Sequence, residues 1–163
     1  MIEVNDIELE IIDFWRKDKT FEKSLKGKKK QFVFYDGPPF ATGLPHYGHL
    51  LASTIKDTIP RFWTMKGYKV ERVWGWDCHG LPIESIVEKE LGFKSKKDIE
   101  TMGVEKFCNQ CENTVLKYVH DWKGFVERLG RWVDFDNSYK TMDVNYMESV
   151  WWAFKEIWNK GFI

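Results

Sequence analysis

The sequence is poor in cysteine, has no long apolar run and carries no net charge. Only 3 of its 163 residues are cysteine, an odd number that does not fit the disulfide framework of small secreted domains, so a reducing, cytoplasmic location is expected. No apolar run of about 18 residues occurs, which argues against a membrane-spanning helix. With 25 basic and 25 acidic residues, the chain as a whole does not attract a polyanion.

The sequence is rich in aromatic residues, which indicates a folded chain. Aromatic residues make up 17% of it, with 9 Trp and 12 Phe, and this content argues against disorder. The length fits one domain of ordinary size. The last residues are Gly161-Phe162-Ile163, where a glycine typical of a helix end precedes residues typical of a strand start. We interpret the chain as a fragment of a longer protein.

The first half of the sequence has the pattern of a strand–helix–strand unit. A first helix, capped by Asn5 or Asp6, precedes a lysine-rich stretch that is either a solvated linker or a minor contact to RNA phosphates. Residues 31–35 have the apolar pattern of a buried strand, residues 48–66 that of a helix, and residues 69–74 that of a second strand. Two strands joined in this way should be parallel, with a right-handed crossover.

Two long helices are expected in the second half. Helical spacing runs from 104 to 129, and Gly130 should end that helix. After a turn at 134–138, Thr141 or Asp143 can cap a last helix. The residues expected to face inward on the helix at 48–66 and on the last helix are Leu51, Ile55, Ile59, Phe62, Met65, Met147, Val150, Trp151, Phe154, Ile157 and Trp158.

The loop from Gly37 to His49 carries the most informative chemistry. In an open parallel sheet, ligands bind beyond the carboxyl ends of the strands, where this loop is expected to lie. It also leads into a helix N-terminus, which favours anions. His46 and His49 share one face of the first turn, and Gly48 between them leaves an opening for a flat base or a phosphate. The set is suited to hold a nucleotide triphosphate and to stabilise charge on its α-phosphate.

Metal binding and other nucleotide motifs are weaker interpretations. His46 and His49 could ligate a metal, but no third ligand lies close in the sequence, so no metal site is expected. Cys108 and Cys111 fall on the apolar face of the predicted long helix, which favours core packing over a zinc site. The phosphate-binding pattern GxxxxGK[ST] and the dinucleotide pattern GxGxxG are both missing from the sequence.

The segment Pro45-His46-Tyr47-Gly48-His49 resembles the first signature of the class I aminoacyl-tRNA synthetases. The residues before it, DGPPFATGLP at 36–45, and the second loop, WGWDCHGLPIE at 74–84, resemble the isoleucine branch of that family. So does the tail GRWVD at 130–134, with TMD at 141–143 and ESVWW at 148–152 after it. The resemblance covers almost the whole chain after about Asp6. It implies an α/β chain, the first half of a Rossmann-like nucleotide-binding fold followed by a helix-rich segment.

The resemblance also implies three parts. Residues 1–30 would form an N-terminal helix and basic linker, and residues 31–92 the first βαβ part of the catalytic domain. Residues 93–163 would form a helical continuation leading to an editing insertion that this sequence lacks. The second signature loop of the family, rich in lysine and serine, is also missing. We therefore expect the chain to hold only half of an ATP and amino-acid site.

Roles for individual residues follow from the same resemblance. Both histidines, His46 and His49, would be catalytic, since they stabilise the transition state of adenylate formation. The residues implied in ATP binding are Pro39, Gly43, His46, Gly48 and His49. The residues implied in amino-acid binding are Pro38, Trp76 and Asp77. The Asp77 carboxylate would pair with the α-ammonium group of the substrate, and a loop-capping role for Asp77 is the alternative.

The implied function is a ligase reaction in two steps. ATP, accompanied by Mg²⁺, would activate L-isoleucine to isoleucyl-adenylate, and the aminoacyl group would then pass to tRNA(Ile). The alternatives are a truncated, non-catalytic fragment that binds an adenylate or a tRNA, and a related nucleotidyltransferase. No membrane partner is expected, and the oligomeric state is left open.

Overall fold

The structure is a computed structural model that describes residues 3–27, 30–40 and 42–163. The chain forms two compact units, each built from separate stretches of sequence. The first unit comprises residues 1–37, 44–74 and 119–137, and the second comprises residues 38–43, 75–118 and 138–163. Lys28 and Lys29 of the lysine-rich stretch lie outside the described residues. So does Ala41 of the loop from Gly37 to His49, which we call the histidine loop. The division of the sequence at residues 30 and 92 stays a prediction.

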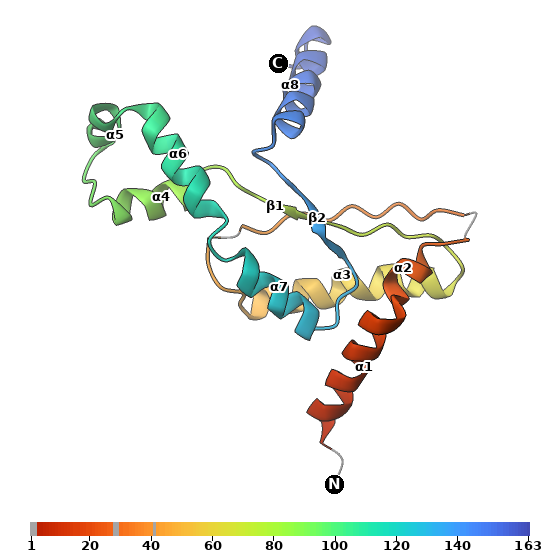
Figure 1. The fold of residues 1–163 in the computed structure, drawn as a ribbon. Coiled ribbons are helices and arrows are strands. Elements are labelled where there is room, and N and C mark those ends of the chain that lie inside the picture. The colour runs from red at the N-terminus through yellow and green to blue at the C-terminus, as the bar shows by residue number, and fades with distance from the viewer. Residues whose placement is uncertain (1–2, 28–29, 41) are drawn as a thin grey trace. The chain divides into compact units, whose positions relative to one another are not determined.

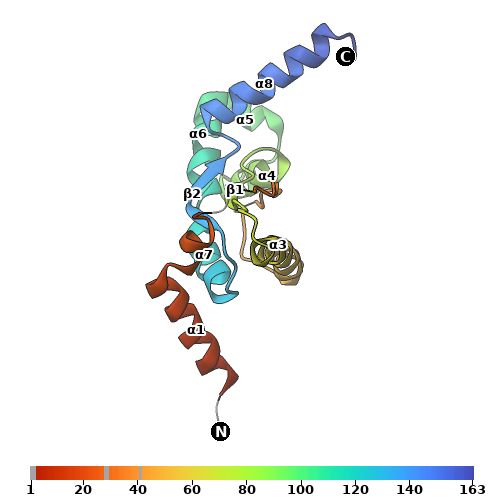
Figure 2. The same ribbon diagram turned by 90° about the vertical axis from the view of Figure 1, so that its right-hand side faces the viewer.

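The first unit is built around one long helix, α3 (Tyr47–Met65), which is yellow in Figure 1. Helix α7 (Val119–Arg128) lies beside it, and Figure 2 looks almost along the axis of α3. The N-terminal helices α1 (Val4–Asp18) and α2 (Thr20–Ser24) complete this unit. Two predictions are confirmed here, since α3 lies within a residue of its expected bounds and Gly130, in the left-handed conformation at φ 73°, follows the end of α7.

The second unit is helical. Helix α6 (Val104–Val115) packs against α4 (Leu81–Glu90) and α5 (Lys96–Met102), the green helices of Figure 1. The last helix, α8 (Val144–Asn159), has Asp143, one of the two predicted positions, as its N-cap residue, but the Asp143 side chain makes no capping hydrogen bond. Gly161 at φ 75° follows the helix. The buried residues of this unit's core include Trp76, Ile83, Val87, Phe107 and Val115.

The strands are short and parallel. Strand β1 (Val73–Trp76) pairs with β2 (Asp134–Lys140) in a two-stranded sheet. The Asp134 N–H donates to the Arg72 carbonyl, and the Thr141 N–H donates to the Trp76 carbonyl. The two segments therefore run in the same direction, and the strands are parallel. Two isolated parallel bridges, Gln31 to Lys69 and Phe40 to Asp77, join the segments on either side of α3. The predicted parallel direction is confirmed, but residues 31–35 do not form a continuous strand.

The predicted helix at 104–129 and turn at 134–138 are both wrong. The helix is broken between Val115 and Val119, because α6 buries its apolar face in the second unit and α7 in the first. An apolar period that continues across such a break gives no sign of it. Residues 134–140 form β2, since pairing with β1 outweighs the low strand propensity of aspartate and asparagine.

The apolar stripes of α3 and α8 do not face inward as predicted. On α3, Leu51 is 64% exposed, whereas Ser53 and Pro60 are buried. On α8, Trp151 is 68% exposed, and the other large apolar side chains of that stripe are also exposed, except Met147, which is half-buried. The inward face of α3 is instead its polar face, which bonds to the segment after α7. Periodicity locates an apolar face, but it does not show whether a partner covers that face.

The cysteines also differ from the prediction. Cys108 is exposed and Cys111 is half-buried, so they do not fill the core together, whereas Cys78 is buried. Burial raises the pKa of the Cys111 thiol, and the nearby Cys108, Glu84 and Glu88 raise it further. Cys111 therefore stays a protonated thiol at neutral pH.

Gly75 in β1 lies directly under the ring of Tyr139. A methyl group added to Gly75 would stand 2.2 Å from the ring carbon Cζ, so the ring would have to leave its stack on Tyr146, where the centroids are 5.6 Å apart. We expect Gly75→Ala to lower the free energy of unfolding by about 1–3 kcal/mol, as measured by urea denaturation.

A matched control is Gly124→Ala in α7, where an added methyl meets nothing within 4 Å. That change should raise stability by up to about 1 kcal/mol, because alanine favours a helix over glycine. Equal effects of the two substitutions would contradict the close approach of Tyr139 to Gly75.

Candidate active site

The two histidines cap the N-terminus of α3 and each other. His46 is the N-cap residue, and its Nδ1 accepts a hydrogen bond from the Gly48 N–H at 3.1 Å. The His49 Nδ1 accepts one from the His46 N–H at 3.2 Å. This is a reciprocal capping box built from imidazoles. Because Nδ1 accepts a hydrogen bond in both rings, each ring carries a proton on Nε2. Each ring therefore has an Nε2–H to donate.

The histidine rings are packed against each other and against α7. Their centroids are 3.8 Å apart, and Trp122 meets the His49 ring edge-on at 4.7 Å. Burial lowers the pKa of His49 below its ordinary value, and the nearby His46 and Lys56 lower it further. At neutral pH His49 is thus held as a neutral hydrogen-bond donor in a fixed orientation.

Gly48 leaves room for the His46 ring, and not for a ligand to approach the backbone. A Cβ at this position would lie 2.9 Å from the His46 Cε1 and 3.1 Å from its Nδ1. The space that the sequence suggested for a base or phosphate is therefore occupied by the imidazole itself. The role of Gly48 in binding ATP stays a prediction, while its role in seating His46 follows from this contact.

The start of α3 is suited to an anion. Its first turn has no acidic residue, and its helix dipole adds positive potential at the N-terminus. An N-terminus with side-chain donors beside it is a common phosphate-binding arrangement. His46 is exposed, and His49 is partly so. The Nε2–H groups of the two rings are the donors that this site offers to the oxygens of a phosphate.

The residues predicted for the amino-acid site lie in the second unit. The Asp77 N–H donates to the Pro39 carbonyl at 2.9 Å, so the two loops are joined there. Asp77 is also held from both sides by Thr141. The Thr141 N–H donates to the Trp76 carbonyl at 3.0 Å, and the Thr141 Oγ1 accepts from the Cys78 N–H at 2.9 Å. Thr141 itself is buried, and sequence reasoning considered it only as a helix cap.

The predicted site residues are distributed over both units. His46, Gly48 and His49 belong to the first unit, and Pro38, Pro39, Gly43, Trp76 and Asp77 to the second. Trp76 is 1% exposed, so its indole packs within the core and is not open to stacking. The contacts of all these residues with a substrate stay predictions.

A charged cluster at the start of the histidine loop was missed by sequence reasoning. The Asp36 carboxylate forms ion pairs with Arg131 and Lys56. The Lys56 Nζ also donates to the Gly37 carbonyl at 2.9 Å, and the Arg131 Nη1 donates to the Ser53 Oγ at 3.3 Å. Ninety-five positions separate Asp36 from Arg131 in the sequence, so no spacing could have linked them.

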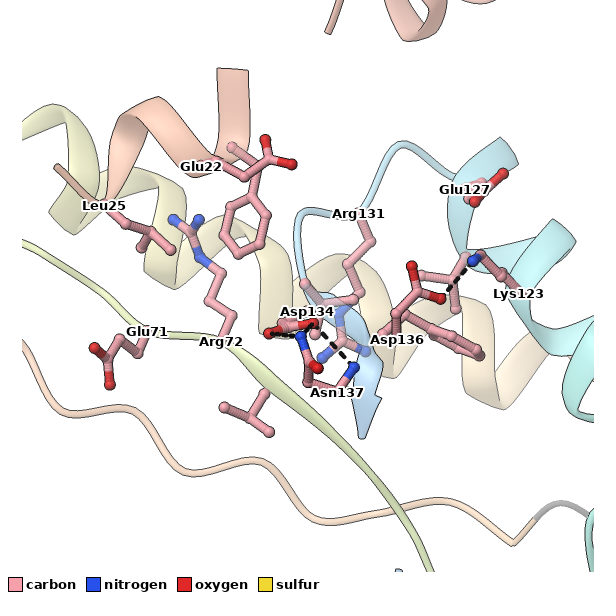
Figure 3. Close-up of a pocket in the computed structure, with 15 residues that line it drawn as sticks. Glu22, Leu25, Glu71, Arg72, Lys123, Glu127, Arg131, Asp134, Asp136 and Asn137 are labelled. Atoms are coloured by element: carbon pink, nitrogen blue, oxygen red, sulfur yellow. Dashed lines mark hydrogen bonds and ion pairs between the residues drawn. The ribbon is translucent and has the colours of Figure 1, made fainter. Parts of the chain in front are cut away.

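A pocket of about 590 Å³ in the first unit lies beside this cluster. Figure 3 shows Arg131 reaching across it, Lys123 paired with Asp136, and Asn137 bonded to Asp134. Acidic residues outnumber basic ones in its lining, which does not favour a triphosphate. The carboxylates of the lining belong to Glu22, Glu71, Glu127, Asp134 and Asp136. None of the predicted site residues lines this pocket.

Comparison with known proteins defines the family. The family model of class I tRNA synthetases (I, L, M and V) matches residues 10–163. The chain belongs to this family. Isoleucine--tRNA ligase 2 of Pseudomonas fluorescens is 61% identical over 155 residues, covering 94% of the chain and 15% of that protein. The isoleucine--tRNA ligase of Mycobacterium tuberculosis is 55% identical over 157 residues, covering 95% and 15%.

A solved structure supports the fold of this class I synthetase chain. The crystal structure of the ternary complex of Agrobacterium radiobacter K84 agnB2 LeuRS-tRNA-LeuAMS has a TM-score of 0.60 at 22% identity, covering 94% of the chain and 17% of that one. At this identity the likeness shows the fold alone. The chain spans about 15% of the length of the curated relatives it matches. Among the described residues, no helix is both long enough and apolar enough to cross a bilayer.

Gly48→Ala should displace the His46 ring and remove its bond to the Gly48 N–H. We expect the ¹⁵N resonances of the His46 imidazole to move, and the free energy of unfolding to fall by about 0.5–2 kcal/mol as the cap is lost. Gly43→Ala is the matched control in the same loop, since its methyl would meet nothing within 4 Å. Unchanged His46 resonances in Gly48→Ala would show that the ring does not lie over this glycine.

Lys56→Met should raise the pKa of His49 toward the ordinary value of 6.5, because it removes one of the charges that lower it. Lys56→Arg should leave that pKa low. Since the unfolded chain binds the proton more readily, the neutral His49 stabilises the fold above about pH 6.5, and this contribution is lost as pH falls through the lowered pKa. NMR titration of the imidazole measures the pKa of His49. A pKa that Lys56→Met leaves unchanged would show that the charge of Lys56 does not lower it.

Proposed function

We propose that the chain is the N-terminal catalytic segment of an isoleucine–tRNA ligase. The observation that carries the proposal is the pair of imidazoles at the start of α3, both with Nδ1 occupied and Nε2–H available. The printed names of relatives at 53–61% identity, all isoleucine--tRNA ligases, support the choice of substrate. The substrates would be L-isoleucine, ATP and tRNA(Ile), in the cytoplasm.

In the first step, a carboxylate oxygen of isoleucine attacks the α-phosphorus of ATP and pyrophosphate leaves. Negative charge builds on the α-phosphate oxygens in the transition state. The Nε2–H groups of His46 and His49 donate to those oxygens, and the N-terminus of α3 adds its dipole. No protein nucleophile takes part, so the rate depends on how well these donors are positioned.

The second unit would bind the amino acid. The Asp77 carboxylate pairs with the α-ammonium group, and the Pro38 carbonyl borders the site, while Trp76 packs in the core behind Asp77. Thr141 supports this role, because it fixes the backbone on both sides of Asp77. In the second step, a terminal hydroxyl of tRNA(Ile) attacks the carbonyl carbon of the adenylate and AMP leaves.

Mg²⁺ would arrive with the triphosphate. Across residues 3–27, 30–40 and 42–163, no three metal-ligating side chains are gathered in one place. The donors that the chain offers at α3 are nitrogens with protons, which suit phosphate oxygens and not a hard cation. The ion would therefore be held by the phosphate oxygens of ATP, and it would supply charge neutralisation on the leaving pyrophosphate.

The proposal is tested by isoleucine-dependent exchange of pyrophosphate into ATP. Because the chain spans about 15% of its relatives, we expect weak exchange by the chain alone. Strong exchange is expected from a chimera in which residues 10–163 replace the matching segment of the P. fluorescens relative. In that chimera His49→Ala should lower kcat by about 100- to 1000-fold, the effect of losing one transition-state donor.

Valine and leucine serve as substrate controls. Exchange that ignores the amino acid would favour a nucleotidyltransferase. A chimera that binds tRNA with strong salt dependence but shows no exchange would favour a non-catalytic fragment. Either result would refute the proposal, and robust aminoacylation by the isolated chain would refute the expected half-site.

A further inference from the structure

Four residues on one face of α3 contact the segment from 119 to 132, and they recur every four positions. Trp122 meets the His49 ring, and Arg131 donates to Ser53. The Trp132 N–H donates to the Asp57 Oδ1 at 3.1 Å, and Arg61 donates to the Gly130 carbonyl. On a helix, positions spaced by four lie one above the other on one face. The first of these residues is a proposed catalytic histidine.

Three of the four contacts on this face are hydrogen bonds, which are polar and directional. Asp57 also bonds the Arg61 Nε, so a single carboxylate joins the Trp132 backbone to the next turn of α3. The Arg61 guanidinium lies over the Trp132 ring at 4.0 Å and near the Trp15 ring at 4.9 Å. Hydrogen bonds fix rotation and translation along a helix axis more strictly than apolar contacts do. α3 is therefore held in one register.

The same segment also holds Asp36, the residue just before the histidine loop. The Arg131 side chain is 5% exposed and its partner Asp36 is 12% exposed. Lys56 joins them through Asp36 and through the Gly37 carbonyl. Gly37, at the start of the loop, is thus tied to Lys56 of α3, while His46 at its end is the N-cap residue of α3. A shift of Arg131 would reach the start of the loop through Asp36, and the face of α3 that carries His49 through Ser53.

We propose that Arg131, acting through Asp36 and Ser53, is a positioning residue for the histidine pair. It does not touch the reacting atoms. It sets the orientation of the first turn of α3 and the start of the loop, so that both Nε2–H groups point to one phosphate. The inference rests on the proposed function for its chemical meaning, but its geometry is tested on the chain itself.

The test compares Arg131→Met with Arg131→Lys by imidazole NMR of the 163-residue chain. In Arg131→Met we expect the His46 and His49 ¹⁵N resonances to move and the ring-to-ring contact between them to weaken. Arg131→Lys keeps the charge facing Asp36 and should restore most of both signals. His79, in the second unit, is the internal reference and should not move.

Arg128→Met is the matched control. Arg128 precedes Arg131 by three positions, but it bonds Asn5 and Glu8 of α1 instead of α3. Its loss should leave the His46 and His49 resonances in place. If Arg131→Met leaves them in place as well, or if Arg128→Met moves them equally, the positioning role is overturned. If Arg131→Met does not fold, Asp57→Asn replaces it, because it loosens the next turn of the same face of α3. The His46 and His49 resonances are then the measurement that decides.

Kinetics of the chimera separate this inference from the function itself. A positioning role predicts that Arg131→Met lowers kcat for exchange by about 10- to 100-fold, the cost of displaced catalytic groups. The KM for isoleucine should change little, because Asp77 is held by Thr141. No exchange by the unmodified chimera would contradict the proposed function, while the NMR comparison would still decide the role of Arg131. A rise in KM with unchanged kcat would overturn that role.

Discussion

The part-buried ion pair between Arg131 and Asp36 is the interaction on which the first unit depends. Removing two charges from water is costly, and their attraction offsets the cost only if the other polar atoms nearby are also bonded. Lys56 supplies a second cation to Asp36, and Ser53 accepts from Arg131. Each partner is needed to make the burial of the others tolerable. The residues before the histidine loop, the middle of α3 and the segment after α7 therefore have to stay together.

This constraint explains why α3 turns a polar face inward. Ser53, Asp57 and Arg61 meet the backbone and side chains of residues 130–132, while Leu51 on the opposite stripe is exposed. An amphipathic pattern identifies which face is apolar, and burial normally follows it. Here hydrogen-bonded contacts decide the orientation, and they have no periodic signature.

The sequence was sufficient where the signal is local. The bounds of α3, the glycines that follow α7 and α8, and the parallel direction across α3 all rest on caps, glycine conformation and short-range pattern. The histidine spacing likewise placed both rings on one turn. Local pattern could not show that the long helix is split, that 134–140 is a strand, or that Asp36 pairs with Arg131. Those features depend on residues distant in the sequence, which no spacing reveals.

The segment from 130 to 141 contributes an anchoring residue to each of the two units. In the first unit Arg131 holds Asp36 and Ser53, and in the second Thr141 holds the backbone on both sides of Asp77. A reaction without a protein nucleophile gains its rate from donors and charges that are already in place. Groups that must stay in position need rigid neighbours, and side chains that are largely enclosed and hydrogen-bonded meet that need. This accounts for the motif at 130–134 and 141–143, which bears no reactive group but supports the two loops that do.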